Sequence, residues 1–272
     1  MGGAAAVIAM SDPRFIRVRD VAKTYVAGAT EVEAVAHVAF DVAEGQFVSI
    51  LGPSGCGKST LLMMCAGLEP ASDGTIEIAG RPVVGPRREF GLIFQDATLL
   101  PWKSSLENVL FPIRMMKRDP AQYRDRAEAL LRQVGLGDFL HKRPSELSGG
   151  MRQRVAICRA LIHDPELLMM DEPFSALDAI TRDEMNEALA RIWETQRKTG
   201  LFVTHSIREA VFLADRVLVM SGRPSTIALD FQVPFARPRD PALVETPEFA
   251  KICAMLKRTI EAGYARTGRS AA

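Results

Sequence analysis

The chain has 272 residues, a formal net charge of +1 and a hydrophobic content of 47%. That length permits one large domain, or one domain with a subdomain, around a full hydrophobic core. Because positive and negative charges are nearly balanced and interleaved, the composition argues against a basic surface that binds duplex nucleic acid.

The N-terminus and the cysteines give little sign of a special environment. No segment of the sequence approaches the roughly 20 apolar residues that a membrane-spanning helix needs, so we expect any role at a membrane to depend on a partner. Residues 1–13 carry no basic leader, and we expect a disordered tail there. The four cysteines lack metal-ligand spacing, which favours reduced thiols in a cytosolic protein.

In chain order, the first predicted elements are strands. Apolar alternation over residues 14–26 and 32–46 predicts antiparallel strands. Residues 46–51 form a short apolar run that leads directly into a glycine-rich loop, and residues 59–68 continue as a predicted helix. A further buried strand is expected over residues 90–95.

The character of the chain then becomes helical before strands return. The spacing of apolar residues predicts helices over residues 105–117, 121–135 and 148–163. Buried-strand character returns over residues 167–173, 201–206 and 216–220. Strands, a helical insert and strands again predict an α/β core with an antiparallel β subdomain and an inserted helical subdomain.

The C-terminal part of the chain differs in composition. Residues 223–249 are rich in proline, and we expect a loop there. A helix over residues 246–262 should follow, and its apolar face would pack back on the domain; a partner-binding helix is the alternative. That face consists of Phe249, Ile252, Cys253, Leu256 and Ile260.

Residues 52–60, GPSGCGKST, match the pattern G-x-x-x-x-G-K-[ST] between a predicted strand and a predicted helix. Backbone N–H groups of such a loop converge on phosphate oxygens, and the helix adds its positive dipole end. Lys58 can reach the β- and γ-phosphates of a nucleotide, and the Ser59 hydroxyl can bind Mg²⁺. Cys56 is either a reactive thiol or, more simply, a small residue that fits the loop. The expected nucleotide-binding residues here are Gly52, Pro53, Ser54, Gly55, Cys56, Gly57, Lys58, Ser59 and Thr60.

Two adjacent carboxylates, Asp171 and Glu172, end an apolar run in the sequence LLMMDEP. Two carboxylates beside a core repel each other and lose hydration unless a cation compensates. Next to a phosphate loop, this pattern predicts that Asp171 holds Mg²⁺ and that Glu172 accepts a proton from, or orients, the attacking water. A helix N-cap or a surface pair at a strand end is the alternative.

His205 and Gln95 also end apolar strands. Because ligands bind at the carboxyl ends of strands in an α/β sheet, we expect the phosphate loop, the acidic pair and His205 to converge at one edge. Taken alone, a single histidine is more often a structural residue, and a glutamine in this position carries little weight.

A second pair of glycines begins a predicted helix in the sequence LSGGMRQR, with Ser148 as a candidate N-cap. By itself this pattern indicates only a capped helix with permissive glycines. The whole chain, however, holds a series of seven patterns in order: Tyr25, GPSGCGKST, FQ at 94–95, LSGGMRQR, LLMMDEP, SALD at 175–178 and TH at 204–205. Over residues 14–222 this series resembles the ATP-binding subunit of an ATP-binding-cassette (ABC) transporter.

The resemblance implies a P-loop NTPase core over residues 14–222, with the helical subdomain inserted at about residues 96–160 and a C-terminal extension over residues 223–272. It also implies that two copies dimerise head to tail and sandwich each ATP between them. In that arrangement Ser148, Gly149 and Gly150 of one copy close on the γ-phosphate held by the other. The second glycine pair would then serve the neighbour's nucleotide.

The same resemblance assigns further roles. Tyr25 is similar to the aromatic residue that stacks on adenine, although a core tyrosine also fits. Gln95 resembles the glutamine that contacts Mg²⁺ and water, and Glu172 resembles the catalytic base. His205 is similar to the switch histidine that holds the γ-phosphate, and Asp178 to the aspartate that reaches across the dimer.

One residue departs from the family pattern. Met151 follows the two glycines where the family usually has glutamine, and methionine lacks that side-chain hydrogen bond. The glycine N–H groups remain, so we expect closure of the dimer to survive. Catalysis is expected to rest on positioning and on charge neutralisation by Lys58 and Mg²⁺.

Residues 94–109 and 174–182 resemble the importer ATPases of the nitrate, sulfonate and taurine group. This implies uptake of a small oxyanion-type solute, with a permease pair and a solute-binding protein as partners, at the cytoplasmic face of the inner membrane. Leu99, Pro101 and Trp102 are expected to contact the permease. A buried Trp102 that packs the helical insert is the alternative.

A soluble ABC-type ATPase that acts on nucleic acid, in repair or translation, is the alternative function. Relatives of that kind carry long coiled-coil insertions or two fused cassettes, and this sequence has neither. A GTP-binding enzyme would carry an N-K-x-D base-reading motif, which the sequence lacks.

Overall fold

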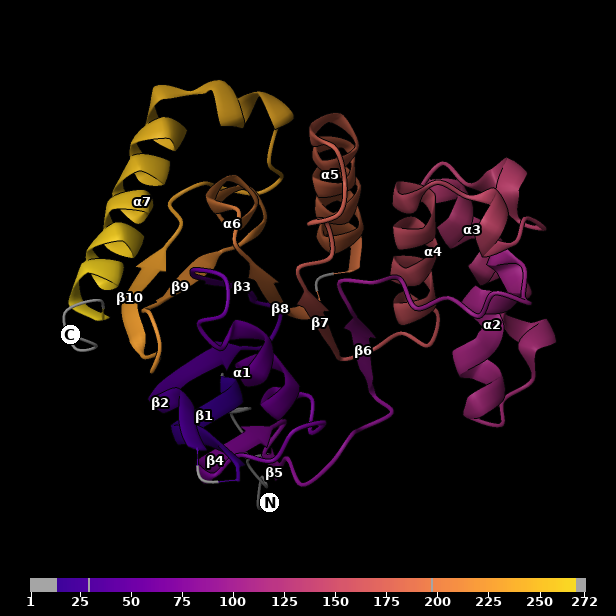
Figure 1. The fold of residues 1–272 in the computed structure, drawn as a ribbon. Coiled ribbons are helices and arrows are strands. Elements are labelled where there is room, and N and C mark those ends of the chain that lie inside the picture. Colours follow the sequence, from indigo (N-terminus) through magenta and orange to yellow (C-terminus); the bar gives the residue numbers. More distant parts are fainter. Residues whose placement is uncertain (1–13, 29, 197, 268–272) are drawn as a thin grey trace, which may run out of the picture.

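The computed structural model describes residues 14–28, 30–196 and 198–267. The expected tail over residues 1–13 lies outside the described residues. Two β-sheets form the body of the protein, and a group of helices stands apart at one side of the larger sheet (Figure 1). Within the described residues, no helix is both long enough and apolar enough to cross a membrane.

The larger sheet has six strands in the order β10-β9-β3-β8-β7-β6. All of them run parallel except β10, which pairs antiparallel with β9 at the edge. Every residue of β3, β7 and β8 is buried, as expected for parallel strands covered on both faces. The strands are β3 (Phe47–Leu51), β6 (Phe90–Ile93), β7 (Leu167–Asp171), β8 (Thr199–Thr204), β9 (Arg216–Met220) and β10 (Ile227–Gln232).

The smaller sheet has four strands in the order β2-β1-β4-β5, and all neighbours pair antiparallel. This confirms the antiparallel strands predicted from apolar alternation. The strands are β1 (Arg14–Ala27), β2 (Thr30–Ala43), β4 (Asp73–Ile78) and β5 (Arg81–Pro82).

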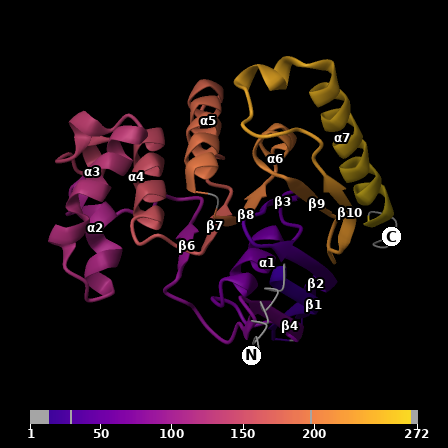
Figure 2. The same ribbon diagram turned by 180° about the vertical axis from the view of Figure 1, so that it is seen from behind.

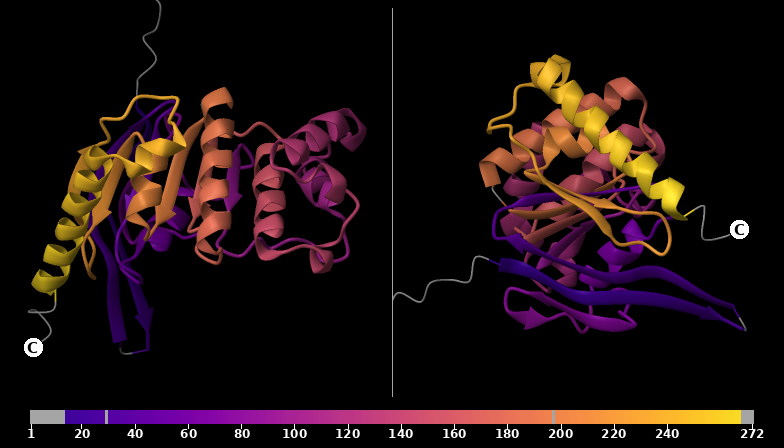
Figure 3. Two further views of the ribbon diagram at one scale, coloured as in Figure 1. Left: turned by 90° about the horizontal axis from the view of Figure 1, so that it is seen from above. Right: turned by 90° about the vertical axis from the view of Figure 1, so that its left-hand side faces the viewer.

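Helix α1 (Lys58–Cys65) lies between the two sheets, which are stacked in Figure 3. Because side chains alternate along a strand, β3 contributes to two cores. Val48 and Ile50 join α1 and the smaller sheet in one hydrophobic cluster. Phe47 and Leu51 join the helices on the opposite face in the other. The helix that follows the phosphate loop is therefore packed between the larger sheet on one side and the smaller sheet on the other.

The group of helices beside the sheet, which we call the helical arm, is inserted between β6 and β7 (Figure 2). Ser104 begins its first helix with a complete capping box, because its side chain and that of Glu107 each accept a backbone N–H of the other. Buried Asn108 fixes the preceding turn by bonding both the N–H and the C=O of Leu100. The arm contains α2 (Ser105–Met115), α3 (Arg124–Gln133) and α4 (Gly149–Leu161).

The proline-rich C-terminal segment is more ordered than the sequence predicts. The expected loop is wrong over β10, where apolar residues alternate with exposed ones on a half-covered edge strand. The prolines on both sides hide this short alternation. After β10 the chain forms a 3-10 helix, η4 (Pro241–Glu245), and α7 (Pro247–Thr267). Buried Phe249 and Leu256 place the apolar face of α7 in the core, so that the helix packs back on the domain beside α6, β9 and β10.

Two more helices cover the same face of the larger sheet. They are α5 (Ala179–Gln196), which follows β7, and α6 (Ile207–Leu213), which follows β8. Each helix follows a strand whose carboxyl end carries predicted catalytic residues, so the loops that lead into these helices lie at the site.

Candidate active site

The predicted catalytic residues meet at one edge of the larger sheet. β8 lies between β3 and β7 in the strand order, and all three run parallel. Their carboxyl ends therefore lead side by side into the phosphate loop, Glu172 and His205. This is the edge at which α/β proteins bind ligands.

The phosphate loop is shaped by glycines. Gly55 and Gly57 have φ values of 75° and 107°, a region that disfavours side chains. Gly57 also caps α1, and a Cβ atom there would lie 2.8 Å from the backbone oxygen of Ala34. Lys58 begins the helix with its ammonium buried, and its Nζ donates to the Pro53 oxygen at 2.9 Å. The loop thus presents backbone N–H groups and one held cation.

Ser59 and Asp171 lie together as predicted. The Ser59 hydroxyl donates to Asp171 Oδ1 at 2.8 Å. Burial raises the pKa of the Asp171 carboxyl, the hydrogen bond from Ser59 lowers it, and the charge of Glu172 raises it further. A cation bound beside Asp171 would favour its ionised form over its protonated form, because a nearby positive charge stabilises a carboxylate.

These two oxygen ligands fit Mg²⁺. Within the described residues, no group of three or more His, Cys, Asp or Glu side chains is placed to hold a metal ion. Mg²⁺ is commonly bound through one or two protein oxygens together with substrate phosphates, rather than by a cage of protein ligands. Ser59 and Asp171 beside the phosphate loop provide such a partial set.

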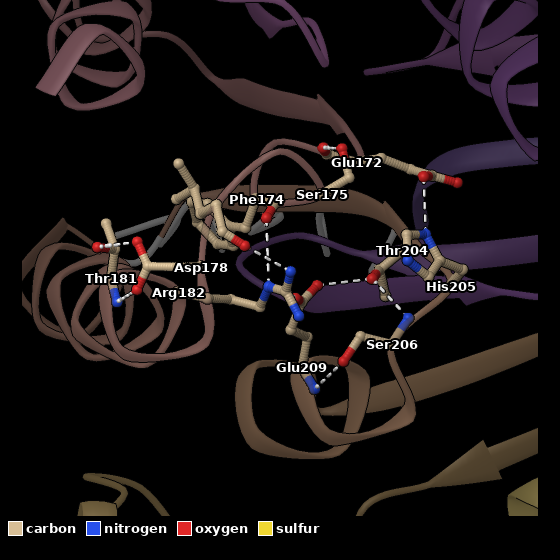
Figure 4. Close-up of polar contacts among 11 residues, drawn as sticks. Glu172, Phe174, Ser175, Asp178, Thr181, Arg182, Thr204, His205, Ser206 and Glu209 are labelled. Carbon is tan, nitrogen blue, oxygen red and sulfur yellow. Dashed lines mark hydrogen bonds and ion pairs between the residues drawn. The ribbon is translucent and has the colours of Figure 1, made fainter. Parts of the chain in front are cut away.

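Glu172 is held between two partners. Its Oε1 lies 3.3 Å from Lys58 Nζ. Its Oε2 lies 2.8 Å from His205 Nδ1, a contact that Figure 4 shows. Its φ of 43° places it in the left-handed region, which is uncommon for a residue with a side chain. Backbone strain of this kind clusters at functional sites. Through its two carboxylate oxygens, Glu172 contacts both Lys58 of the phosphate loop and His205 at the end of β8.

The remaining residues expected in the nucleotide site differ in exposure. Gln95 is exposed just beyond β6, and the preceding Phe94 is held by a hydrogen bond from Gln153 to its carbonyl at 3.2 Å. Tyr25 is 41% exposed on β1, with Lys23 Nζ 5.0 Å above its ring, so the interpretation as a core tyrosine is wrong. Cys56 is buried in the loop, and burial raises the pKa of its thiol.

The residues of the second glycine pair lie elsewhere in the chain. Ser148 caps α4 by accepting from Met151 N at 3.2 Å, and in the described part of the molecule neither it nor the two glycines hydrogen-bond the phosphate loop. Ser148 and Gly149 are exposed. Asp178 is exposed too, and it accepts two hydrogen bonds from Thr181. Met151 packs its side chain partly against the core instead of offering a hydrogen bond.

Sequence reasoning missed three polar residues near the site. Arg182, Thr204 and Glu209 join the loop after Glu172 to the loop that carries His205. The signal for Glu209 was present as S-x-x-E after His205, but that pattern predicts an ordinary helix cap. Ser206 does cap α6 by accepting from Glu209 N at 3.3 Å, but the Glu209 carboxylate bonds the Thr204 hydroxyl instead of the Ser206 N–H.

Comparison with known proteins agrees with this geometry. Residues 35–175 match the family model described as ABC transporter. The chain is 48% identical over 226 residues to a taurine import ATP-binding protein of Rhizobium johnstonii, covering 81% of this chain and 86% of that protein. It is 42% identical over 242 residues to a nitrate import ATP-binding protein of Synechococcus elongatus, covering 88% of each.

A solved structure is similar over most of the chain. It is a dimeric ATP-binding cassette in a post-hydrolysis state bound to ADP and phosphate, with a TM-score of 0.73 and 32% identity. The match covers 81% of this chain and all of that one. The fold, the phosphate loop and these relatives together show that this chain belongs to the ABC transporter family, as an ATP-hydrolysing cassette.

Proposed function

We propose that this chain powers the import of a small oxyanion-type solute, such as nitrate, a sulfonate or a taurine-like compound. The proposal is supported by the similarity to relatives named for taurine and nitrate import. The observation that carries its catalytic part is the contact of Glu172 with both Lys58 and His205 at the carboxyl ends of adjacent strands.

In this proposal the phosphate loop binds the triphosphate of ATP. Residues 52–60 supply backbone N–H groups, and Lys58 neutralises charge on the β- and γ-phosphates. Ser59, Asp171 and Gln95 would hold Mg²⁺, which supplies charge neutralisation to the phosphates when it is bound. Tyr25, exposed on β1, would offer its ring to adenine.

Glu172 then acts as the base that accepts a proton from the attacking water. Its carboxylate is kept in place by His205 Nδ1 at 2.8 Å, and it is reached from the side of the phosphates by Lys58. General-base catalysis depends on such positioning. His205 in turn would contact the γ-phosphate, so that the same residue senses the nucleotide and orients the base.

Each site would be completed by a second copy of the chain. Ser148 and Gly149 are exposed at the start of α4, where helix N–H groups can meet an anion. Asp178 is exposed beside Ile180, which leaves 75% of its surface uncovered. These residues would face the other copy in a head-to-tail dimer. Loss of the γ-phosphate would then remove the contact that holds the two copies together.

The partners outside the dimer would be permease subunits, with a solute-binding protein delivering the solute. The cassette would sit at the cytoplasmic face of the membrane through the permease. Trp102 is 67% exposed beside Pro101, which supports a contact surface on the helical arm and argues against the buried alternative.

The proposal is tested by purifying the intact complex and measuring ATP hydrolysis with candidate oxyanions, each offered with its binding protein. One oxyanion should stimulate hydrolysis several-fold, and Lys58→Ala should abolish both ATP binding and stimulation. If none of nitrate, sulfonates or taurine stimulates while Lys58→Ala still loses ATP binding, the solute class is wrong and the ATPase assignment stands.

A further inference from the structure

A buried carboxylate, Glu209, lies behind the catalytic edge in a position that helix capping does not explain. Ser206 and Glu209 have the spacing of a capping box, in which the glutamate would accept the N–H of Ser206. Here the Ser206 N–H donates to Thr204 Oγ1 at 2.9 Å instead. The Thr204 hydroxyl donates to Glu209 Oε2 at 2.6 Å. Glu209, which is 4% exposed, therefore holds the residue that precedes His205.

Arg182 lies in the first turn of α5, just after the segment 172–178, and its side chain faces Glu209. Its Nε lies 3.7 Å from Glu209 Oε1. The same guanidinium donates to the Phe174 oxygen at 3.3 Å and to the Leu177 oxygen at 2.7 Å. Both carbonyls belong to the segment that runs from Glu172 to Asp178. Figure 4 shows the guanidinium between this segment and Glu209.

These contacts form a closed circuit. The segment 172–178 is bonded to Arg182, Arg182 pairs with Glu209, and Glu209 bonds Thr204. The next residue, His205, returns to Glu172 at 2.8 Å. These side chains thus attach the two loops to each other at two points, one facing the nucleotide site and one behind it, in addition to the backbone bond from Glu172 N–H to the Val203 oxygen.

The Glu209 end of the rear attachment is buried, whereas Arg182 leaves 32% of its side chain exposed. Taking a carboxylate out of water is costly unless a cation and hydrogen bonds compensate, and removing one partner leaves the other unpaired. A displacement of Arg182 from Glu209 would therefore be opposed. A guanidinium suits this place because its planar fork can bond two carbonyls and still face a carboxylate.

We propose that Arg182 and Glu209 are positioning residues that fix the loop 172–178 against the loop 204–206 and so keep Glu172 and His205 in contact. This rests on the proposed roles of Glu172 and His205 in hydrolysis. A misplacement of about 1 Å at a reacting group can cost up to about 100-fold in rate. Loosening the rear attachment should accordingly slow the chemical step and leave the phosphate loop unaffected.

The test is a double-mutant cycle on ATP hydrolysis by the full-length protein, with Glu209→Gln, Arg182→Met and the two combined. Each single variant should lower kcat about tenfold and change KM for ATP by less than about twofold. Because both residues act through one attachment, the combined variant should be no more than about twofold slower than either single variant. Arg182→Lys, which keeps the charge but lacks the fork, should recover part of the loss.

Glu187→Gln and Arg191→Met are the matched controls. These residues form an exposed ion pair at 3.3 Å on the same helix, one to three turns beyond Arg182. Both controls should stay within about twofold of the unmodified protein. Folded fractions from urea unfolding correct every rate for lost protein. If Glu209→Gln does not fold, Thr204→Val breaks the same attachment and should give the same split between kcat and KM.

Three results would overturn the inference: an unchanged kcat per folded molecule, losses that multiply in the combined variant, or equal losses in the controls. Glu172→Gln separates this failure from failure of the proposed function. If Glu172→Gln stops hydrolysis while Glu209→Gln is normal, the positioning role alone is wrong. If Glu172→Gln hydrolyses normally, the assigned base is wrong, and the positioning role falls with it.

Discussion

At the scale of single residues, the site depends on places where the backbone has little room. Gly57 combines a φ of 107° with close approach to Ala34 on β2. Glu172 adopts a left-handed backbone conformation although it has a side chain, and its N–H donates a hydrogen bond to the Val203 oxygen at 2.9 Å. Both features bring functional groups to the edge of the sheet, and at Glu172 this has a cost in local strain, because glycine adopts a positive φ freely and glutamate does not.

Replacing Gly57 should therefore damage nucleotide binding more than strain alone would. A Cβ atom there would lie 2.8 Å from a backbone oxygen, so the loop must shift. We expect Gly57→Ala to weaken ATP binding by roughly tenfold or more, measured by calorimetry.

Gly80→Ala is the matched control for this prediction. Its φ is 70°, and nothing lies within 4 Å of the Cβ position. It should lose about 1 kcal/mol of stability and bind ATP normally. Equal affinities for both variants would show that the close approach at Gly57 does not shape the site.

Cys56 is expected to be unreactive at neutral pH despite its place in the phosphate loop. Burial raises the pKa of its thiol above the ordinary 9.0, and the charge of Lys58 only partly opposes this. At pH 7.5 a thiol with a pKa of 9 is about 3% thiolate, the reactive form, and a higher pKa lowers that fraction. Alkylation at Cys56 should accelerate as the pH rises past 9.

Mass spectrometry of timed iodoacetamide labelling can check the order of the four cysteines. Half-buried Cys253 should react ahead of Cys56. Cys65 and Cys158 should react last, because burial raises the pKa of each to about 12. A dominant early product at Cys56 at pH 7.5 would restore the interpretation as a reactive thiol.

At the scale of elements, the C-terminal extension stabilises the helix that follows His205. Arg239 is buried, and its guanidinium donates to the Val211 and Phe212 oxygens at the end of α6. Arg237 donates to the Leu213 oxygen and pairs with Asp215. Carbonyls at a helix end lack partners within the helix, so these arginines take the place of missing N–H groups.

Arg239→Ala should therefore lower the free energy of unfolding by about 3 kcal/mol, since it removes hydrogen bonds from a charged donor and leaves buried carbonyls unpaired. Burial lowers the pKa of Arg239 to about 10, so the side chain is still charged at neutral pH. Urea unfolding measures the change. Lys257→Ala, on the exposed side of α7, should change the stability by less than about 0.5 kcal/mol; equal losses would contradict the capping role.

The sequence predicted those elements whose pattern is local. Short, mostly apolar runs located β3, β7 and β8, and the polar residues at or just after their ends identified the phosphate loop, Asp171, Glu172 and His205. β10 was missed because a half-buried edge strand leaves only a short alternation between prolines. The Arg182–Glu209 pair was missed because it depends on which loops the sheet order brings together, and spacing along the chain carries no trace of that.

At the scale of the whole molecule, one chain holds two glycine-rich helix starts that do not meet within the described residues. The phosphate loop begins α1 beneath the larger sheet, and Ser148 begins α4 in the helical arm (Figure 1). A single copy leaves Ser148, Gly149 and Asp178 exposed. The solved cassette that the chain resembles is a dimer, which supports a second copy as their partner.

The most direct test of the account is the mass of the Glu172→Gln protein in solution with ATP and Mg²⁺, measured by sedimentation. The variant should hydrolyse ATP at a rate reduced at least about 100-fold, so that ATP persists and holds two copies together. The predicted mass is that of two 29.8 kDa chains with ATP and of one chain with ADP. Adding Ser148→Arg should restore the single mass with ATP. A protein that stays at the mass of one chain with ATP, even at high concentration, would contradict the account.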